Sequence, residues 1–248
     1  MISRAEIKTR AKAAFMRNYW LCVGIFAILS GTGGSAAAGY MSVFYPIFSV
    51  VFIAAIIFVG GPFTVSHARA SLNAYDGKRL SFADIIWCFR EGRYWKCVGS
   101  MALPTLFTAL PSIVIIPFAG TVSPFIARAL DQAYGLHAAG YVAVIVGTIL
   151  LGALIALIPT IIIGLSLSQT AYLVADGELS GMAAVRRSRE LMSGHRWELF
   201  VFGLSFLGWS ILAALSEGVS GIFWSGPYMS ISYAGYYREL SGGTAAAV

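Results

Sequence analysis

Charged side chains are scarce in this chain of 248 residues, and their scarcity excludes an ordinary water-soluble domain. Asp, Glu, Lys and Arg together make up 11% of the residues, whereas a soluble domain carries about 25%. Hydrophobic residues make up 58%, and the mean hydropathy is +0.77. The apolar runs leave too little polar sequence for a separate soluble domain. We therefore expect an all-α integral membrane protein with a single membrane domain over residues 1–248.

Groups that could carry catalysis or hold a metal are few and scattered. The sequence has no Walker loop, no GxSxG elbow, no HExxH and no CxxC. No histidine has a second His or a Cys at metal-ligand spacing: the three are His67, His137 and His195. We therefore expect no enzyme, no metal and no cofactor. The cysteines all fall in the half of the chain that the charge pattern places in the cytoplasm, where thiols stay reduced: Cys22, Cys88 and Cys97.

Long apolar runs are abundant. Six of them cover approximately residues 20–40, 43–66, 97–120, 138–174, 198–216 and 221–237. Of the 17 Lys and Arg residues, 16 lie before the first run or in every second gap after it, and only Arg128 lies in the alternate gaps. This bias predicts six transmembrane helices with both termini in the cytoplasm. The net charge of +6 is spread along the chain as a topology signal, so we expect no nucleic-acid partner.

A short motif recurs where charge gives way to apolar sequence. Tyr19-Trp20-Leu21-Cys22-Val23-Gly24 returns as Tyr94-Trp95-Lys96-Cys97-Val98-Gly99, and a weaker copy reads His195-Arg196-Trp197. Aromatic residues mark the membrane interface. Three like-oriented entries therefore predict three hairpins, in repeat units of approximately residues 3–78, 81–177 and 180–240. A pseudo-threefold axis along the membrane normal could relate them.

Each hairpin is expected to begin with an amphipathic helix on the cytoplasmic side. Ser3 with Glu6, and Ser81 with Asp84, have the spacing of a capping box. In the first unit one helical face carries Ile7, Ala11, Ala14 and Phe15, which predicts a helix lying among lipid headgroups, with a solvated charged linker as the alternative. In the third unit, residues 180–196 offer an apolar side and three arginines that could bind anionic headgroups: Arg186, Arg187 and Arg189.

The fourth apolar run, residues 138–174, is too long for one simple crossing. Pro159 lies inside it and would kink or break a helix. Two crossings here would move the following arginine-rich loop to the outside and abolish the charge bias. We therefore expect one crossing, which is either kinked or followed by an interfacial helix.

The returning helix of each hairpin carries a proline followed by hydroxyl side chains. These residues could line a polar path, because serine can satisfy carbonyls that proline leaves unpaired, or they could allow close helix packing. The candidates for a polar bundle interior are Pro62, Ser66, His67, Pro159, Ser166, Ser168, Gln169, Pro227, Ser230 and Ser232.

Several blocks of the chain resemble a known family. They are Ser188-Arg189-Glu190-Leu191-Met192-Ser193-Gly194-His195, residues 204–209, Pro227-Tyr228, Tyr236-Tyr237 and the opening residues 3–8. Together they resemble the bacterial integral membrane family called domain of unknown function 975. The resemblance implies a multi-pass protein of the bacterial cytoplasmic membrane, without an established activity or functional residues to carry over. The family usually has Pro-Gly where this chain has Pro159-Thr160.

Two classes of function fit these features. In the first, the bundle is an accessory or scaffold protein of the envelope, which recruits other membrane proteins or a second copy of itself through its cytoplasmic helices. In the alternative, the bundle surrounds a polar path and passes a small solute or a lipid. The lack of charge in the middle of the runs speaks against an ion-coupled pump. We expect the accessory or scaffold role, with the lipid bilayer as a constant partner.

Overall fold

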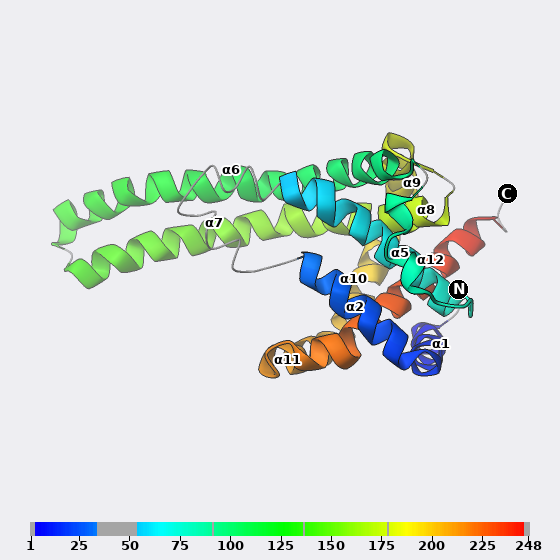
Figure 1. The fold of residues 1–248 in the computed structure, drawn as a ribbon. Coiled ribbons are helices and arrows are strands. Elements are labelled where there is room, and N and C mark those ends of the chain that lie inside the picture. Colours follow the sequence, from blue (N-terminus) through cyan, green and yellow to red (C-terminus); the bar gives the residue numbers. More distant parts are fainter. Residues whose placement is uncertain (1–2, 34–53, 91, 136, 178, 246–248) are drawn as a thin grey trace. The chain divides into compact units, whose positions relative to one another are not determined.

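The computed structural model describes residues 3–33, 54–90, 92–135, 137–177 and 179–245, and within these ranges the chain is all-α (Figure 1). This confirms the all-α part of the predicted fold class. The chain forms two compact units. Unit 1 comprises residues 1–103 and 167–248, and unit 2 comprises residues 104–166.

Unit 1 gathers the helices of the N-terminal and C-terminal parts of the chain. They are α1 (Arg4–Arg17), α2 (Tyr19–Gly33), α5 (Gly61–Tyr75), α8 (Thr170–Asp176), α9 (Met182–Leu191), α10 (Arg196–Leu204), α11 (Leu207–Leu215) and α12 (Gly226–Ala245). Helix α12 packs against α1 and α5, and α5 packs against α8. The returning helices of the three predicted hairpins therefore meet through α5, α8 and α12. No observation tests the predicted pseudo-threefold axis, which stays a prediction.

A π-helical turn precedes the Gly-Pro pair of two returning helices. The turns are η1 (Ile56–Gly60) before α5 and η4 (Gly221–Ser225) before α12. Proline has no N–H and its ring crowds the preceding turn, and the wider π turn accommodates it. Near Pro62 the Tyr94 hydroxyl donates to the carbonyl of Phe58 over 2.9 Å, so a neighbouring side chain satisfies a backbone acceptor there. The similarity of the first and third repeat units thus extends to their backbone geometry.

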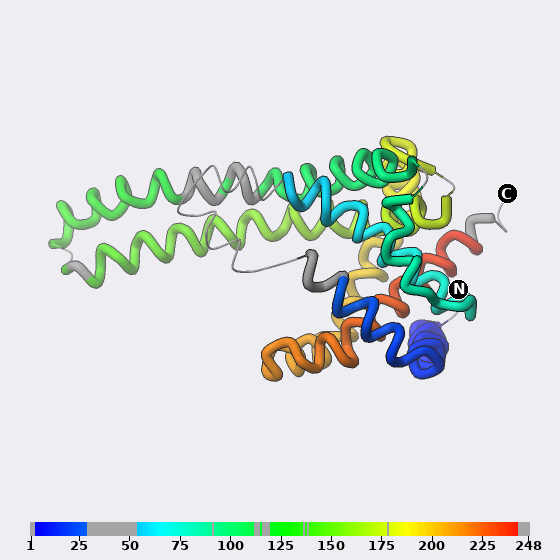
Figure 2. The backbone as a smooth tube through the Cα atoms, in the orientation of Figure 1, coloured from blue at the N-terminus to red at the C-terminus, as the bar shows by residue number. Residues whose placement is uncertain are grey.

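Unit 2 is a hairpin made from the greater parts of α6 (Tyr94–Tyr134) and α7 (Ala138–Leu167), which run side by side (Figure 2). Helix α6 has 41 residues. At 1.5 Å per residue it is about 60 Å long, about twice the thickness of a bilayer's hydrocarbon core. It continues past the predicted end of the third run at residue 120. A hairpin of this length has more helix than one crossing requires.

Helix α7 passes through Pro159 without a break. The Thr160 hydroxyl donates to the Ala156 carbonyl over 2.8 Å, one turn back, where the helix continues. The chain instead breaks at Ser168-Gln169, between α7 and α8. The fourth run is therefore one continuous helix followed by a short one, and it is not bent back at the proline.

The surface of this long apolar helix is largely uncovered by protein. In the most apolar 18-residue stretch of Ala139–Asp176, only 11% is buried by the rest of the protein. A core helix of a soluble protein is mostly buried. Among the described residues it is the one helix long and apolar enough to cross a bilayer, and α10 with α11, bent by 44° at their break, form a second candidate. Residues 34–53, which include the end of the first run and the first part of the second, lie outside the described residues. Six crossings therefore remain a prediction.

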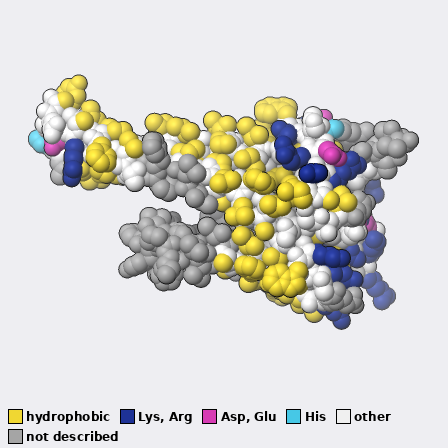
Figure 3. Space-filling model, turned by 90° about the horizontal axis from the view of Figure 1, so that it is seen from above, with side chains coloured by type: hydrophobic (Ala, Val, Ile, Leu, Met, Phe, Trp, Pro, Cys, Tyr) yellow, Lys and Arg dark blue, Asp and Glu magenta, His cyan; other side chains and the backbone are white. Residues whose placement is uncertain are grey.

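Charge is segregated on unit 1. Lys and Arg side chains gather at one end of this unit, and hydrophobic side chains cover the adjoining surface (Figure 3). Helix α1 and the C-terminal part of α12 lie at the same end (Figure 1). We call it the basic end. Its position agrees with the predicted grouping of the positive gaps on one side.

The predicted surface helices α1 and α9 both form, but protein covers their apolar faces. Ser3 caps α1, since its side chain accepts from the Glu6 N–H over 3.2 Å. The apolar face of α1 is buried through Ile7, Ala11 and Phe15, and α1 packs against α12. The expectation that this face lies among lipid headgroups is therefore wrong. Helix α9 likewise buries its apolar side, through Ala184, Val185, Leu191 and Met192.

The second repeat unit (residues 81–177) departs from the pattern, because two 3₁₀ turns replace the predicted amphipathic helix. They are η2 (Phe82–Asp84) and η3 (Trp87–Phe89). The capping box of Ser81 and Asp84 is complete, as the spacing predicts. The residues that follow it, Ile85-Ile86-Trp87, are β-branched or aromatic and favour a helix less than straight-chain residues do. A satisfied first turn was therefore not enough to propagate a helix.

Two of the three cysteines are joined, contrary to the expectation of reduced thiols. Cys88 of η3 and Cys97 of α6 form a disulfide, with their Cα atoms 6.3 Å apart, within the usual range for such a bond. Both are buried in the core of unit 1. Cys22 is free and buried. The disulfide ties the 3₁₀ turns to the first turn of the helix that enters the second hairpin.

Candidate functional site

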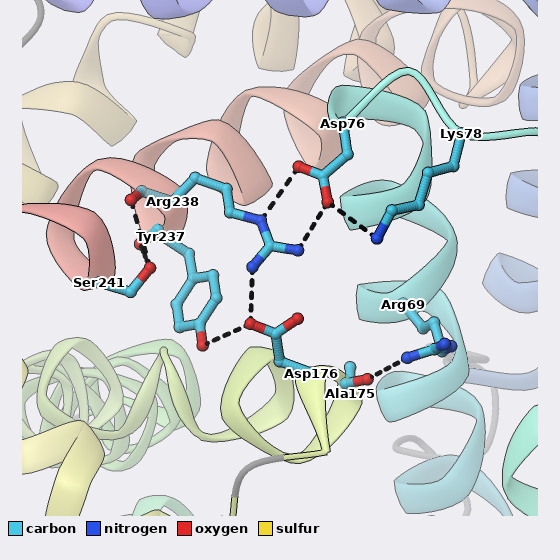
Figure 4. Close-up of polar contacts among 8 residues, drawn as sticks. All are labelled: Arg69, Asp76, Lys78, Ala175, Asp176, Tyr237, Arg238 and Ser241. Atoms are coloured by element: carbon cyan, nitrogen blue, oxygen red, sulfur yellow. Dashed lines mark hydrogen bonds and ion pairs between the residues drawn. The ribbon is translucent and has the colours of Figure 1, made fainter. Parts of the chain in front are cut away.

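The most organised polar cluster of unit 1 lies where its returning helices end. Arg238 of α12 reaches across to the carboxylates that close α5 and α8 (Figure 4). Its Nε and Nη2 donate to Asp76 over 3.1 and 2.7 Å, and its Nη1 donates to Asp176 over 2.6 Å. We call Asp76, Asp176 and Arg238 the carboxylate–arginine node. One guanidinium thereby holds together three helices that lie far apart in sequence.

Further contacts complete this node. The Tyr237 hydroxyl donates to Asp176 over 3.4 Å, and Lys78 Nζ lies 3.6 Å from Asp76 (Figure 4). Two cations therefore balance two carboxylates. The side chains are about a quarter exposed: 27% for Arg238, 20% for Asp76 and 22% for Asp176. The pairs are neither fully screened by water nor fully buried.

The protonation of Arg238 follows from these contacts. Burial acts to lower the pKa of the guanidinium, but hydrogen bonds and charge attraction from Asp76 and Asp176 outweigh it and raise the pKa above its usual value. Arg238 therefore stays charged at every pH at which the protein can be handled. The positive member of the node is therefore permanently charged.

The sequence contains a signal for this node that the motif analysis missed. Helices α5 and α8 both end in Asp-Gly, at Asp76-Gly77 and Asp176-Gly177. Both glycines have positive φ, 76° and 84°, as is common just after a helix C-terminus. The shared dipeptide marks equivalent ends of the first two repeat units. Comparing only the starts of the units overlooked it.

A second arginine secures the end of α8. Arg69 of α5 donates from Nη1 to the Ala175 carbonyl over 2.6 Å (Figure 4). Carbonyls in the last turn of a helix lack intrahelical donors, so this contact satisfies a backbone acceptor. The same guanidinium lies 4.6 Å from the centroid of the Trp87 ring.

A small cavity lies between α2, α5 and α12. Its volume is about 20 Å³, enough for about one water molecule. Of the predicted interior residues it brings together His67, Pro227 and Ser230, from the first and third units, and Ser71 and Cys22 also line it. The cavity therefore brings together candidate residues from two of the three predicted hairpins. The cavity is too small to hold a solute.

The candidate residues from the second repeat unit (residues 81–177) do not line this cavity. Ser166, Ser168 and Gln169 lie at the end of α7 and the break that follows it. Gln169 is 2% exposed and donates to the Ser168 hydroxyl over 2.9 Å, and its Oε1 has no partner among the described atoms. Pro159 lies within unit 2. The described residues thus do not join the three hairpins into one polar path.

The remaining candidates serve helix packing and helix geometry. Ser66 is fully buried, and its hydroxyl accepts from the Cys88 N–H over 3.4 Å. Ser232 is also fully buried and donates to the Tyr228 carbonyl one turn back. Pro62 lies in the first turn of α5 and is buried. These positions match the packing interpretation of the proline–serine segments.

The predicted headgroup contacts lie on the surface of α9. Arg186 and Arg189 are exposed, and Arg187 pairs with Glu190 over 3.3 Å on the same helix. Because α9 buries its apolar side in protein, these arginines form a positive surface on a docked helix.

The sequence does not predict a contact that Lys8 makes at the break between α10 and α11. Lys8 of α1 donates from Nζ to the Ser205 carbonyl at this break over 3.2 Å, and the same ammonium lies 4.1 Å from the Phe206 ring centroid. The contact holds the N-terminal helix against the third hairpin. No motif in the sequence indicates it.

Comparisons with known proteins identify the family and nothing finer. No curated protein and no solved structure matches the chain. The family described as "protein of unknown function (DUF975)" matches residues 1–243. Nearly the whole chain is covered, including the node and all three repeated junctions. The chain therefore belongs to this family, as its C-terminal blocks predict.

Proposed function

We propose that the protein is a multi-pass protein of the bacterial cytoplasmic membrane that acts as an accessory or scaffold protein of the envelope and has no catalytic activity. Its six crossings form three hairpins with both termini in the cytoplasm. The observation that carries the membrane assignment is the long apolar helix over Ala139–Asp176, of whose most apolar 18-residue stretch only 11% is buried. Such a surface is stable in hydrocarbon and unstable in water.

The carboxylate–arginine node supports the proposed topology independently of the charge count. Its three members come from three segments that the positive-inside rule places in the cytoplasm: residues 67–96, 175–197 and 238–248. A wrong topology for any one of these segments would separate residues that are in contact. The same basic end carries α1 and the C-terminal part of α12 (Figures 1 and 3).

The scaffold role is supported by how the polar groups of unit 1 are used. The node, the Arg69 contact and the Lys8 contact all join one helix to another. The docked helices α1 and α9 present charged side chains to the outside of unit 1. Arg186 and Arg189 of α9 are available to an anionic headgroup layer or to an acidic membrane-protein partner. A rigid body with an exposed basic surface suits recruitment better than transport.

The transport alternative makes a different prediction about water access. In a cysteine-free protein reconstituted in liposomes, Ser166→Cys and Ser230→Cys should stay unreactive toward a water-soluble thiosulfonate, because Ser166 is buried and Ser230 borders a cavity with room for about one water molecule. Gln132→Cys, an exposed position beside the hairpin tip, serves as the reactive control. Mass spectrometry of the labelled protein gives the readout. Rapid labelling of both serine positions would support a hydrated path and remove the scaffold interpretation.

A further inference from the structure

We propose that the protein pairs with a second copy of itself through the far end of its long hairpin, residues 121–134 of α6 and the neighbouring part of α7. The proposal rests on the proposed membrane function and names the partner. Two copies inserted with the same topology are related by a twofold axis along the membrane normal. We call the contacting surface, centred on Phe125, Arg128 and Asp131, the tip face. Gln132 lies at its rim, which stays open to water.

The first argument is that the end of this hairpin lies outside the hydrocarbon. Helix α6 has 41 residues and is about 60 Å long, whereas crossing a 30 Å core at a steep tilt of 40° takes about 39 Å. Trp95 lies at the start of α6, is 69% exposed and marks the cytoplasmic interface, so about 20 Å of helix stands beyond the opposite one. Arg128 and Asp131 are the only charged residues between Lys96 and Asp176. Because charge is costly in hydrocarbon, they belong to the projecting part.

The second argument is the apolar surface of this projecting part. Phe125 of α6 is 70% exposed, and Val142 and Val146, one turn apart on α7, are 57% and 48% exposed. Ser123 and Ala127 are fully buried and mark the face of α6 that turns into the hairpin. Lipid tails cannot cover side chains that stand beyond the bilayer. An apolar surface in water instead marks a contact with protein.

The third argument decides which protein covers this surface. Arg128 and Asp131 are exposed, and their side chains form no ion pair or hydrogen bond within the part of the chain that the structure describes. Phe125, Arg128 and Asp131 follow one another every three residues and share one side of α6. Acidic and basic side chains lie beside each other at the tip of the hairpin (Figure 3).

The symmetry of two membrane-inserted copies makes this pair of charges complementary to itself. About a twofold axis along the membrane normal, the two hairpins project to the same side and equal residues lie at equal heights. Arg128 then stands about 4.5 Å along the axis from the partner's Asp131, a distance that an arginine side chain spans. The partner's Arg128 meets Asp131 in the same way. One charge of each sign per copy thus forms two ion pairs across the contact, with Phe125 beside them.

The test is association of full-length, cysteine-free protein in liposomes at low protein density. Copies carry a donor or an acceptor dye at Ser180→Cys, an exposed position in unit 1. Energy transfer between wild-type copies should exceed that of a random distribution. Phe125→Ala should weaken association about tenfold, because aromatic side chains at the centre of an interface carry much of the affinity. The matched control is Ile126→Ala, an exposed neighbour on another side of α6, which should associate like the wild type.

Two variants of opposite charge test the ion pairs directly. Arg128→Asp leaves two acids on the tip face and Asp131→Arg leaves two bases, so each variant alone should associate about tenfold more weakly than the wild type. A mixture of the two variants should recover wild-type association, because each copy then meets the opposite charge. A role of these residues within one copy cannot produce that recovery. Lys12→Asp, at an exposed position on α1, is the charge-reversal control and should have no effect.

Each remaining outcome contradicts one part of the account. Equal association by the wild type and Phe125→Ala, or a mixture that associates no better than its separate components, would overturn the tip face. A wild type that stays monomeric in liposomes would overturn the pairing of copies and leave the membrane assignment in place. Failure of the wild type to enter liposomes would instead overturn the proposed membrane function.

Discussion

Replacing Gly226 with Ala should disrupt the packing between the first and third hairpins and destabilise the protein. A Cβ at this position would overlap the Phe26 ring of α2 and would lie 2.5 Å from the carbonyl oxygen of Gly221. The ring could move, but the carbonyl belongs to the π turn η4 and accepts the Gly226 N–H. Overpacking typically costs about 1–3 kcal/mol, occasionally more, and the fixed carbonyl places this site at the upper end. The roughly 1 kcal/mol gain in helix propensity does not offset it.

The matched control is Gly208→Ala in α11, on the same hairpin. A Cβ there would meet no atom within 4 Å, so stability should be unchanged or slightly raised. Heating each purified variant in detergent and following the monodisperse fraction by size exclusion gives the comparison. Equal melting temperatures for the two variants would show that the π turn and the α2 contact are not formed as described.

Replacing Arg238 with Met should be the most damaging change to the electrostatics. It leaves Asp76 and Asp176 facing each other without their shared partner. Removing one member of a buried pair costs about 3–5 kcal/mol, and an exposed pair contributes about 0–1 kcal/mol. With side chains 20–27% exposed, we expect a loss of about 2 kcal/mol, intermediate between these limits.

Two comparisons separate the node from a general loss of charge. Arg187→Met breaks the exposed pair with Glu190 on α9 and should cost less than about 1 kcal/mol. Adding Asp76→Asn and Asp176→Asn to Arg238→Met removes the uncompensated carboxylates and should recover part of the stability. Denaturant unfolding of the four proteins measures both effects. No recovery in the triple variant would mean that Arg238 acts through packing alone.

The sequence predicts those features of the fold that repeat or that follow from side-chain chemistry at a single position. The capping box at Ser81 and Asp84 forms, as does the Ser3 cap. The Gly-Pro pairs recur in equivalent places, although only the structure shows that π turns accompany them. The amphipathic pattern of α1 identifies its buried face correctly. It cannot distinguish burial by lipid from burial by α12, because both remove the same side chains from water.

The missed features depend on contacts between segments far apart in sequence. The carboxylate–arginine node joins residues up to 162 positions apart, and no local sequence pattern predicts which distant residue a side chain will contact. The Lys8 contact at the α10–α11 break is of the same kind. Pro159 suggested a broken helix from its own chemistry, but the helix continues through it and ends at Ser168-Gln169 instead. The Cys88–Cys97 disulfide was not predicted, because thiols in the cytoplasm are expected to stay reduced and the sequence does not show how close the two cysteines lie.

The most direct test of the account is the side of the membrane on which the third basic segment lies. The experiment uses single cysteines at Ser180 and Gln132, both exposed positions, in full-length protein with its native cysteines replaced by serine. In intact cells an impermeant maleimide should label Gln132→Cys and leave Ser180→Cys unlabelled until the membrane is permeabilised. Labelling of Ser180→Cys in intact cells would place residues 175–197 outside, separate the members of the carboxylate–arginine node, and contradict the six-crossing topology.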